Sequence, residues 1–170
     1  MNIVLIGYRG TGKSTVAALL SVRLKWPVYS MDGAIIEETG LSIPQIVEKH
    51  GWDFFRDIES RIARQASTKD RTVIDAGGGV IVRSENITVL RQNSALVWLK
   101  ARPQIIAERI RYNAERPSLT GSKSFIEEIE EVLRERTPKY QEAADLAIDT
   151  TRRSPEEATA EILERLKDRL

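Results

Sequence analysis

The amino-acid sequence predicts an α/β protein with a mostly parallel sheet and helices on both of its faces. Short aliphatic and β-branched runs alternate with longer segments of helical periodicity, which is the pattern of consecutive βαβ units. A glycine-rich loop follows directly on the first aliphatic run. The length of 170 residues fits a single domain, residues 1–170. Ligands of such sheets bind at the carboxyl ends of the strands.

Five short segments are predicted to be strands. The first is an unbroken aliphatic run that Gly7 ends, and the second follows Pro27. The third precedes three consecutive glycines, the fourth is wholly apolar, and the fifth is the weakest signal of the set. In chain order, the predicted strands are residues 2–6, 28–29, 72–76, 95–99 and 145–149.

Longer segments with apolar residues near helical spacing separate these strands and are predicted to be helices. The second segment is broken into two helices near Gly51, because glycine interrupts helical periodicity. The last helix begins with Ser154 as its N-cap and Pro155 at its first position. The predicted helices are residues 13–24, 43–66, 102–111, 124–136 and a final one from 155, whereas residues 112–123 are predicted to be a loop.

The composition excludes several kinds of chemistry. The chain has no cysteine and one histidine, His50, which excludes disulfides, cysteine metal sites, thiol nucleophiles and multi-histidine metal sites. A formal net charge of +1 argues against a general nucleic-acid-binding surface. The first apolar run is too short for a signal peptide or a membrane span, so we expect a cytoplasmic protein with no membrane partner.

The sharpest motif is the segment from Gly7 to Ser14, which fits G-x-x-x-x-G-K-[ST] between a predicted strand and a predicted helix. Its backbone N–H groups and the helix N-terminus attract phosphates. Lys13 can reach the β- and γ-phosphates, and the Ser14 hydroxyl can bind Mg²⁺. The motif alone does not separate a kinase from a GTPase, an ATPase or a regulatory nucleotide binder. The expected ATP-binding residues of this loop are Gly10, Thr11, Gly12, Lys13, Ser14 and Thr15.

The length of the chain favours a small-molecule kinase. Such an enzyme excludes water from its reactants and needs arginines for the developing phosphoryl charge. Arg116 lies in the predicted loop at 112–123 and is a candidate for this role. Arg111 and Arg134 are better interpreted as helix-surface charges.

Six motifs follow one another over nearly the whole chain. They are the phosphate loop, Asp32 with Glu37-Glu38-Thr39-Gly40, Gly51-Trp52-Asp53-Phe54-Phe55-Arg56-Asp57-Ile58-Glu59, Gly77-Gly78-Gly79, Glu115-Arg116-Pro117, and Arg136-Thr137-Pro138-Lys139-Tyr140. In this order and register they resemble the motifs of the shikimate kinases, which makes them far more specific than the phosphate loop alone.

The resemblance implies a three-layer α/β/α kinase fold with a five-stranded parallel sheet in the order 2-3-1-4-5. It also implies a monomer that uses ATP and Mg²⁺ to phosphorylate the 3-hydroxyl of shikimate. The acceptor would bind to a segment at about 32–60, and a lid at about 112–123 would close over it.

The same resemblance assigns roles to individual residues. Asp32 would orient the attacking hydroxyl or act as its base, and Lys13 and Arg116 would complete the catalytic set. Arg56, positioned by Glu59, and Arg136 would clamp the shikimate carboxylate, since a guanidinium can donate two parallel hydrogen bonds to it. The remaining implied contacts are Gly78 and Gly79 with the shikimate ring, Arg109 and Arg153 with the adenine, and Arg116 with the transferred phosphate.

Plain structural interpretations stand beside these roles. Asp32 taken alone is equally interpretable as a helix N-cap, and Arg56 with Glu59 as a surface ion pair. Trp52, Phe54 and Phe55 are interpreted as core residues.

One position departs from the family pattern. The family usually has Asp-x-Asp after the second strand, and Ser30 occupies the first of these acidic positions here. A serine hydroxyl is a weaker, neutral partner for Mg²⁺. Asp75, at the end of the third predicted strand, is the alternative source of the missing charge, although a loop-capping role is equally open.

Two other functions remain open from the sequence. One is a kinase of another small polyol, sugar acid or nucleotide. The other is a non-catalytic nucleotide-binding module, which only the serine at position 30 supports.

Overall fold

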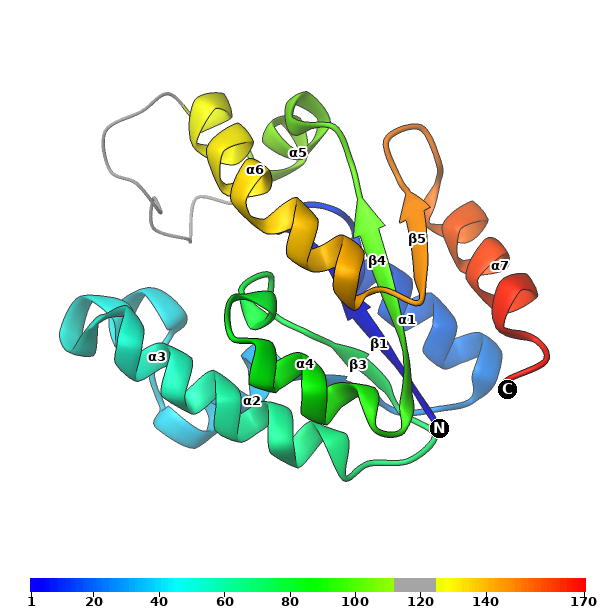
Figure 1. Ribbon diagram of the computed structural model, residues 1–170, viewed down its shortest axis with the longest axis horizontal. Coiled ribbons are helices and arrows are strands. Elements are labelled where there is room, and N and C mark those ends of the chain that lie inside the picture. Colours follow the sequence, from blue (N-terminus) through cyan, green and yellow to red (C-terminus); the bar gives the residue numbers. More distant parts are fainter. Residues whose placement is uncertain (112–124) are drawn as a thin grey trace.

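A computed structural model describes residues 1–111 and 125–170 (Figure 1). Its elements alternate along the chain between parallel strands and helices. In chain order they are β1 (Asn2–Ile6), α1 (Lys13–Leu24), β2 (Val28–Ser30), α2 (Met31–Thr39), α3 (Ile43–Ser67), β3 (Val73–Asp75), the 3₁₀ turn η1 (Val80–Val82), α4 (Ser84–Arg91), β4 (Ser94–Lys100), α5 (Pro103–Ile110), α6 (Phe125–Ala143), β5 (Leu146–Asp149) and α7 (Pro155–Leu166).

The sheet has five parallel strands in the order β2-β3-β1-β4-β5. The central strand β1 pairs with β3 on one side and with β4 on the other, and all five of its residues are buried. This position explains why β1 is an unbroken aliphatic run, since a strand covered on both faces needs apolar side chains on both. The predicted fold class and strand order are confirmed.

The two faces of the sheet pack into separate cores. Ile3 and Leu5 of β1 pack with α1 and α7, whereas Val4 and Ile6 pack with α2, α3, α4 and α6. Figure 1 shows these helices on opposite sides of the strands, with α3, α4 and α6 on one side and α1 with α7 on the other. Alternate residues of one strand therefore belong to different layers, as the pleat requires. The architecture is the predicted three-layer α/β/α arrangement.

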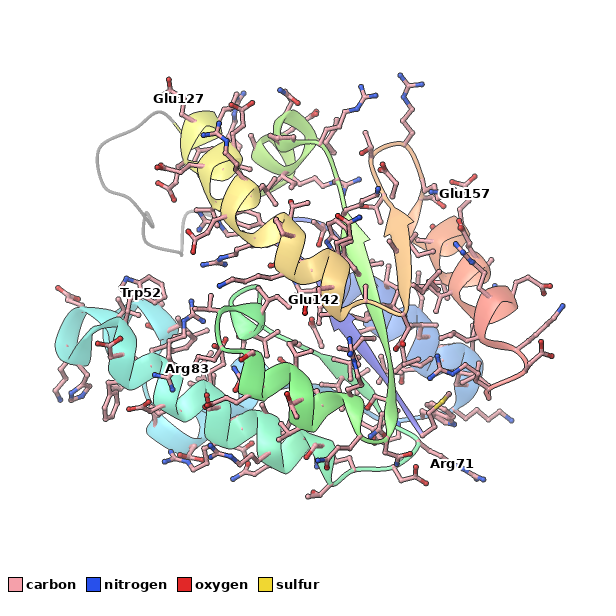
Figure 2. All side chains as sticks on the ribbon, viewed as in Figure 1. Trp52, Arg71, Arg83, Glu127, Glu142 and Glu157 are labelled. Atoms are coloured by element: carbon pink, nitrogen blue, oxygen red, sulfur yellow. The ribbon has the colours of Figure 1, made fainter. Side chains whose placement is uncertain are left out.

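Local signals place several helix boundaries where the sequence predicts them. Ser154 caps α7 in a capping box with Glu157, which Figure 2 labels at the start of that helix. Gly51 interrupts α3 with a φ of 84°, so the predicted break is present as a kink inside one continuous element. Within the described ranges, every helix is too short or too polar for a membrane span.

Three elements differ from the prediction. Helix α2 was not predicted. Ser30 caps it by accepting a hydrogen bond from the Gly33 N–H. The eight-residue helix α4 was not predicted either. Helix α6 continues past the predicted end at 136 to Ala143, because its last turns bury Tyr140 and Ala143 against the sheet. The exposed Pro138 does not end this helix, since tertiary packing outweighs local propensity.

Candidate active site

The phosphate loop joins β1 to α1 and contains three glycines with positive φ angles. A Cβ on Gly7 would overlap the carbonyl oxygen of Leu99, and Gly12 at φ 96° precedes α1 without offering a side-chain cap. Gly12 has no side chain that could cap the first N–H groups of α1. It therefore does not compete with a phosphate for these donors. The Lys13 ammonium donates to the carbonyls of Gly7 at 2.9 Å and Tyr8 at 3.2 Å, which holds it over the loop.

Two oxygen side chains meet beside this loop. The Ser14 hydroxyl donates a 2.6 Å hydrogen bond to Oδ2 of Asp75, which ends β3. The Ser30 hydroxyl accepts from Gly33 at 3.0 Å as the cap of α2, although Ser30 also lines the same cavity. Asp75 is thus the carboxylate in contact with Ser14, at the sheet position paired with Ser30.

Two cavities adjoin at the carboxyl ends of the strands. Phosphate-loop residues line the first, together with Ser30, Asp75 and Arg109. The second lies between α3, α6 and the glycine turn after β3, and Ile43, Trp52, Phe55, Arg56, Glu59, Gly79 and Arg136 are among its lining residues. Both cavities are lined by Arg9, Asp32, Gly77 and Gly78. The two cavities therefore join at these four residues, and Asp32 is the carboxylate among them.

Arg56 and Glu59 form a buried ion pair in the second cavity. Arg56 Nη1 donates to Glu59 Oε2 at 2.7 Å, and the two residues are 9% and 1% exposed. Burial raises the pKa of the Glu59 carboxyl, while the charge of Arg56 opposes this rise. The interpretation as a surface ion pair is therefore wrong. A Cβ on Gly79 would overlap the Arg56 guanidinium, so the glycine leaves the space that this side chain fills.

The aromatic residues of α3 near Arg56 differ in how deeply they are buried. The Arg56 guanidinium carbon lies 5.4 Å from the Trp52 ring centroid and 5.1 Å from that of Phe55. Phe55 is a core residue as predicted, Trp52 is only partly buried and packs against the same core, and both line the cavity. Figure 2 shows Trp52 on α3. Phe54 is 44% exposed, so its interpretation as a core residue is wrong.

Asp32 lies in the first turn of α2, two residues after the Ser30 cap. Ser30 is the N-cap of α2, so the interpretation of Asp32 as the N-cap is wrong. A Cβ on Gly77 would lie 2.7 Å from Asp32 Oδ1, so a larger residue at this position would displace the carboxylate. The arrangement places Asp32 where both cavities meet.

Helix α6 fixes the glycine turn from the opposite side. Arg136 Nη1 donates to the Gly78 carbonyl at 3.2 Å, and the Tyr140 hydroxyl donates to the same oxygen at 2.5 Å. Tyr140 is fully buried and stacks on Trp98, with ring centroids 5.7 Å apart. Burial raises the pKa of Tyr140 to about 12, so its hydroxyl stays a donor at neutral pH.

A third hollow adjoins the phosphate loop on the side of α5 and α7. Gly10, Thr11, Gly12, Thr15, Val16, Arg109, Thr150, Arg153 and Pro155 line it. Arg109 donates to the Gly10 carbonyl at 3.3 Å and to Thr150. Arg153 donates to the Asp149 carbonyl at 2.7 Å and pairs with Glu161 at 3.1 Å. The two arginines predicted to flank an adenine thus line one hollow beside the phosphate loop.

A model of the shikimate kinase family matches residues 9–167, which is nearly the whole chain. The chain belongs to the shikimate kinase family. The shikimate kinase of Enterococcus faecalis is 38% identical over 167 residues, which cover 98% of this chain and 99% of that relative. The shikimate kinase of Dehalococcoides mccartyi is 35% identical over 166 residues, which cover 98% and 93% of the two chains.

A solved structure of a family member is also similar to this fold. The shikimate kinase of Acinetobacter baumannii in complex with shikimate matches with a TM-score of 0.93 and 28% identity. The match covers 99% of this chain and 93% of that chain. Sequence and structure therefore agree on the family over nearly the full length.

Most of the residues that the family resemblance singles out line the three cavities just described. Arg116 and the predicted lid at 112–123 are the exception, because they lie outside the described residues. Sequence reasoning assigned no role to Arg9, Trp52, Tyr140 or Thr150, all of which line a cavity or hold its wall. Arg9, Trp52 and Tyr140 lie within the family motifs, so their positions were a usable signal. Thr150 lies in no quoted motif, and only the fold reveals its contacts.

Proposed function

We propose that this chain transfers the γ-phosphate of ATP to the 3-hydroxyl of shikimate and releases 3-phosphoshikimate and ADP. The observation that carries the proposal is the junction of the phosphate cavity with the Arg56–Arg136 cavity at Asp32. Family membership supports the choice of shikimate as acceptor. We also propose that the chain acts as one domain, with residues of about 32–60 forming most of the acceptor side.

The acceptor cavity suits a small cyclic acid. Arg56 and Arg136 line it together and offer guanidinium groups to a planar carboxylate, which can accept two parallel hydrogen bonds from each. The hydrogen bond to Glu59 holds one edge of the Arg56 guanidinium, so this side chain is ordered before the acceptor arrives. Asp32 would accept a hydrogen bond from the 3-hydroxyl and orient its oxygen toward the γ-phosphorus.

The transfer step forms a bond between the 3-oxygen and the γ-phosphorus and breaks the bond from that phosphorus to the β,γ-bridging oxygen. The hydroxyl proton leaves toward Asp32 or the solvent, and ADP carries away the bond's electron pair. Lys13 and the loop N–H groups stabilise the charge on the phosphates. Arg116 would add charge from the predicted lid, and this role stays a prediction from the sequence.

The residues beside the phosphate loop fit a Mg²⁺ ion. Ser14 and Asp75 present hard oxygen atoms 2.6 Å apart at the end of the phosphate cavity, the donor type that Mg²⁺ prefers. Ser14 would bind the ion, and Asp75 would hold Ser14 and supply negative charge. When bound, Mg²⁺ neutralises charge on the β- and γ-phosphates. Arg109 and Arg153 would flank the adenine at the far end of the loop.

A coupled assay of ADP release tests the proposed function. Purified protein with ATP and Mg²⁺ should release ADP only when shikimate is added, and Lys13→Ala should abolish this release. The methyl ester of shikimate, which lacks the carboxylate charge, should be a much poorer acceptor. Nucleotide binding without turnover of shikimate would instead indicate a binding module. Monomeric state, cytoplasmic location and the absence of a nucleic-acid partner stay predictions, the first of which analytical ultracentrifugation tests.

A further inference from the structure

Thr150 connects three parts of the molecule at the base-binding end of the phosphate loop. It directly follows β5 and is 4% exposed. Its hydroxyl donates to the carbonyl of Thr11 in the phosphate loop at 2.9 Å and also lies 3.2 Å from the carbonyl of Lys100, the last residue of β4. Its N–H donates to the same Lys100 carbonyl at 2.8 Å. The residue therefore joins the ends of β4 and β5 to the phosphate loop.

Arg109 of α5 is the third partner. Its Nη1 donates to the Thr150 hydroxyl at 3.2 Å and to the Gly10 carbonyl at 3.3 Å, and its Nη2 donates to the Thr150 carbonyl at 2.6 Å. These bonds use the edge of the guanidinium and leave its faces without hydrogen bonds, since guanidinium donors lie in the plane of the group. An arginine held in this way can stack a flat aromatic base on one face.

The hydroxyl of Thr150 has one hydrogen atom to donate. The shorter bond, to Thr11, uses that hydrogen, so the oxygen lone pairs face the Arg109 donor. The same group thus accepts from the arginine and donates to the loop, and neither valine nor alanine can replace it in either function. Removal of the Thr150 hydroxyl takes this partner from an N–H of Arg109 and from the buried carbonyl of Thr11. Both groups are then held less firmly in place.

We propose that Thr150 is a positioning residue for the nucleotide, which orients the Arg109 guanidinium and the Thr11 segment of the phosphate loop together. The inference rests on the proposed function, because it takes the hollow lined by Arg109, Arg153 and Pro155 as the base site. Thr150 acts through these groups and not on the acceptor, whose cavity it does not line. Loss of the Thr150 hydroxyl should therefore weaken nucleotide binding and leave the acceptor site intact.

The test compares Thr150→Val, which keeps the shape, with Thr150→Ser, which keeps the hydroxyl. We expect Thr150→Val to raise KM for ATP and Kd for ADP about ten-fold. KM for shikimate and kcat at saturating ATP should stay within about two-fold of the parent values, because Thr150 does not line the acceptor cavity. Thr150→Ser should restore both nucleotide constants to within about three-fold.

Thr72→Val is the matched control. Thr72 is equally buried, at 4% exposed, and its hydroxyl donates to the Asp70 carbonyl before β3 begins, far along the sheet from the phosphate loop. This variant should lose stability without a change in KM for ATP. If Thr150→Val cannot be purified, Thr150→Cys replaces it, since a thiol is a much weaker donor and acceptor of similar size.

Either of two results with Thr150→Val would overturn the inference. The first is an unchanged Kd for ADP in Thr150→Val, and the second is an equal loss of ATP and shikimate affinity in that variant. Failure of Thr150→Ser to restore the nucleotide constants would also contradict it. A parent protein that binds ADP but does not phosphorylate shikimate would refute the proposed acceptor alone. A parent protein that binds no ADP would refute the proposed nucleotide site, and with it this inference.

Discussion

Glu59 is a carboxylate that the fold buries beside the arginine it holds, with 1% of its surface exposed. Burial opposes its ionisation, whereas Arg56 favours it, and the pKa of Glu59 is raised as the net result. A raised carboxyl pKa lowers stability at neutral pH. In the proposed function this cost has a use, because Glu59 holds Arg56 in place for an anionic acceptor.

The pH dependence of stability follows from this shift. Below the ordinary carboxyl pKa both folded and unfolded chains hold the proton. As pH rises toward the higher folded pKa, only the folded chain still holds it, so stability falls through this window and then levels off. Glu59→Gln has no proton to lose. Its free energy of unfolding should therefore rise relative to the parent between pH 4.5 and neutral pH, as measured by urea unfolding.

The same variant should lose acceptor binding. A glutamine oxygen can accept one hydrogen bond from Arg56 but lacks the charge, so we expect KM for shikimate to rise about five- to ten-fold with KM for ATP unchanged. Glu85→Gln, an exposed carboxylate, is the control and should change neither quantity. A flat stability difference across this pH range would contradict the assigned pKa direction.

Asp75 places a carboxylate against the Ser14 hydroxyl. Asp75→Asn keeps a partner for the Ser14 hydroxyl but removes the negative charge beside it, so the fold should survive. We expect the Mg²⁺ concentration for half-maximal activity to rise about ten-fold, because a neutral amide is a weaker partner for a hard cation. Ser30→Ala should change this Mg²⁺ concentration less, because the Ser30 hydroxyl is neutral and already accepts a hydrogen bond as the cap of α2. An unchanged Mg²⁺ titration of Asp75→Asn would show that the carboxylate is not needed.

Residue contacts were only partly predictable from the sequence. The i,i+3 spacing of Arg56 and Glu59 shows that they can pair, but their burial depends on α6 and the glycine turn, which come from distant parts of the chain. The bond between Ser14 and Asp75 joins residues 61 positions apart, so only the register of β1 with β3 creates it. The Thr150 contacts likewise depend on β4 and β5 ending side by side.

Among the elements, α6 connects the sheet with the acceptor cavity. Arg136 and Tyr140 are one helical turn apart and donate to the same Gly78 carbonyl. The sequence predicts this helix only over residues 124–136, where the amphipathic pattern is clear. The helix continues to Ala143 because Tyr140 and Ala143 are buried against the sheet. This burial could not be predicted without knowing where the sheet lies. Helices α2 and α4 are short, with nine and eight residues, and give too few turns for a clear period.

Tyr140→Phe tests how α6 holds the glycine turn. The variant removes one of the two donors to Gly78 and keeps the stack on Trp98. We expect KM for shikimate to rise about five-fold and Tm to fall by a few degrees, since one buried hydrogen bond is worth about 1 kcal/mol. Tyr29→Phe, outside the cavities, is the control and should leave KM unchanged. An unchanged KM for shikimate in Tyr140→Phe would mean that Arg136 alone orients the turn.

For the whole molecule, the parallel sheet sets where chemistry can occur. The carboxyl ends of β1, β2 and β3 lead into the phosphate loop, into Ser30 with α2, and into Asp75 with the glycine turn. This edge was predictable, because βαβ alternation and one phosphate motif place all three loops there. The division into separate acceptor and nucleotide cavities could not be predicted from the sequence, because it depends on side chains from α3, α5 and α6.

Separate cavities predict separate responses to the two ligands. A ligand at 100 times its Kd adds about 2.7 kcal/mol of stability, which for a protein of this size raises Tm by about 5–11 °C. ADP and shikimate should each give such a shift alone in thermal unfolding. Arg136→Gln should lose the shikimate shift and keep that of ADP, whereas Arg109→Gln should do the reverse, because each arginine lines only one of the two end cavities. Loss of both shifts in either variant would mean that the two cavities form one cooperative site, in which filling one end is needed to order the other.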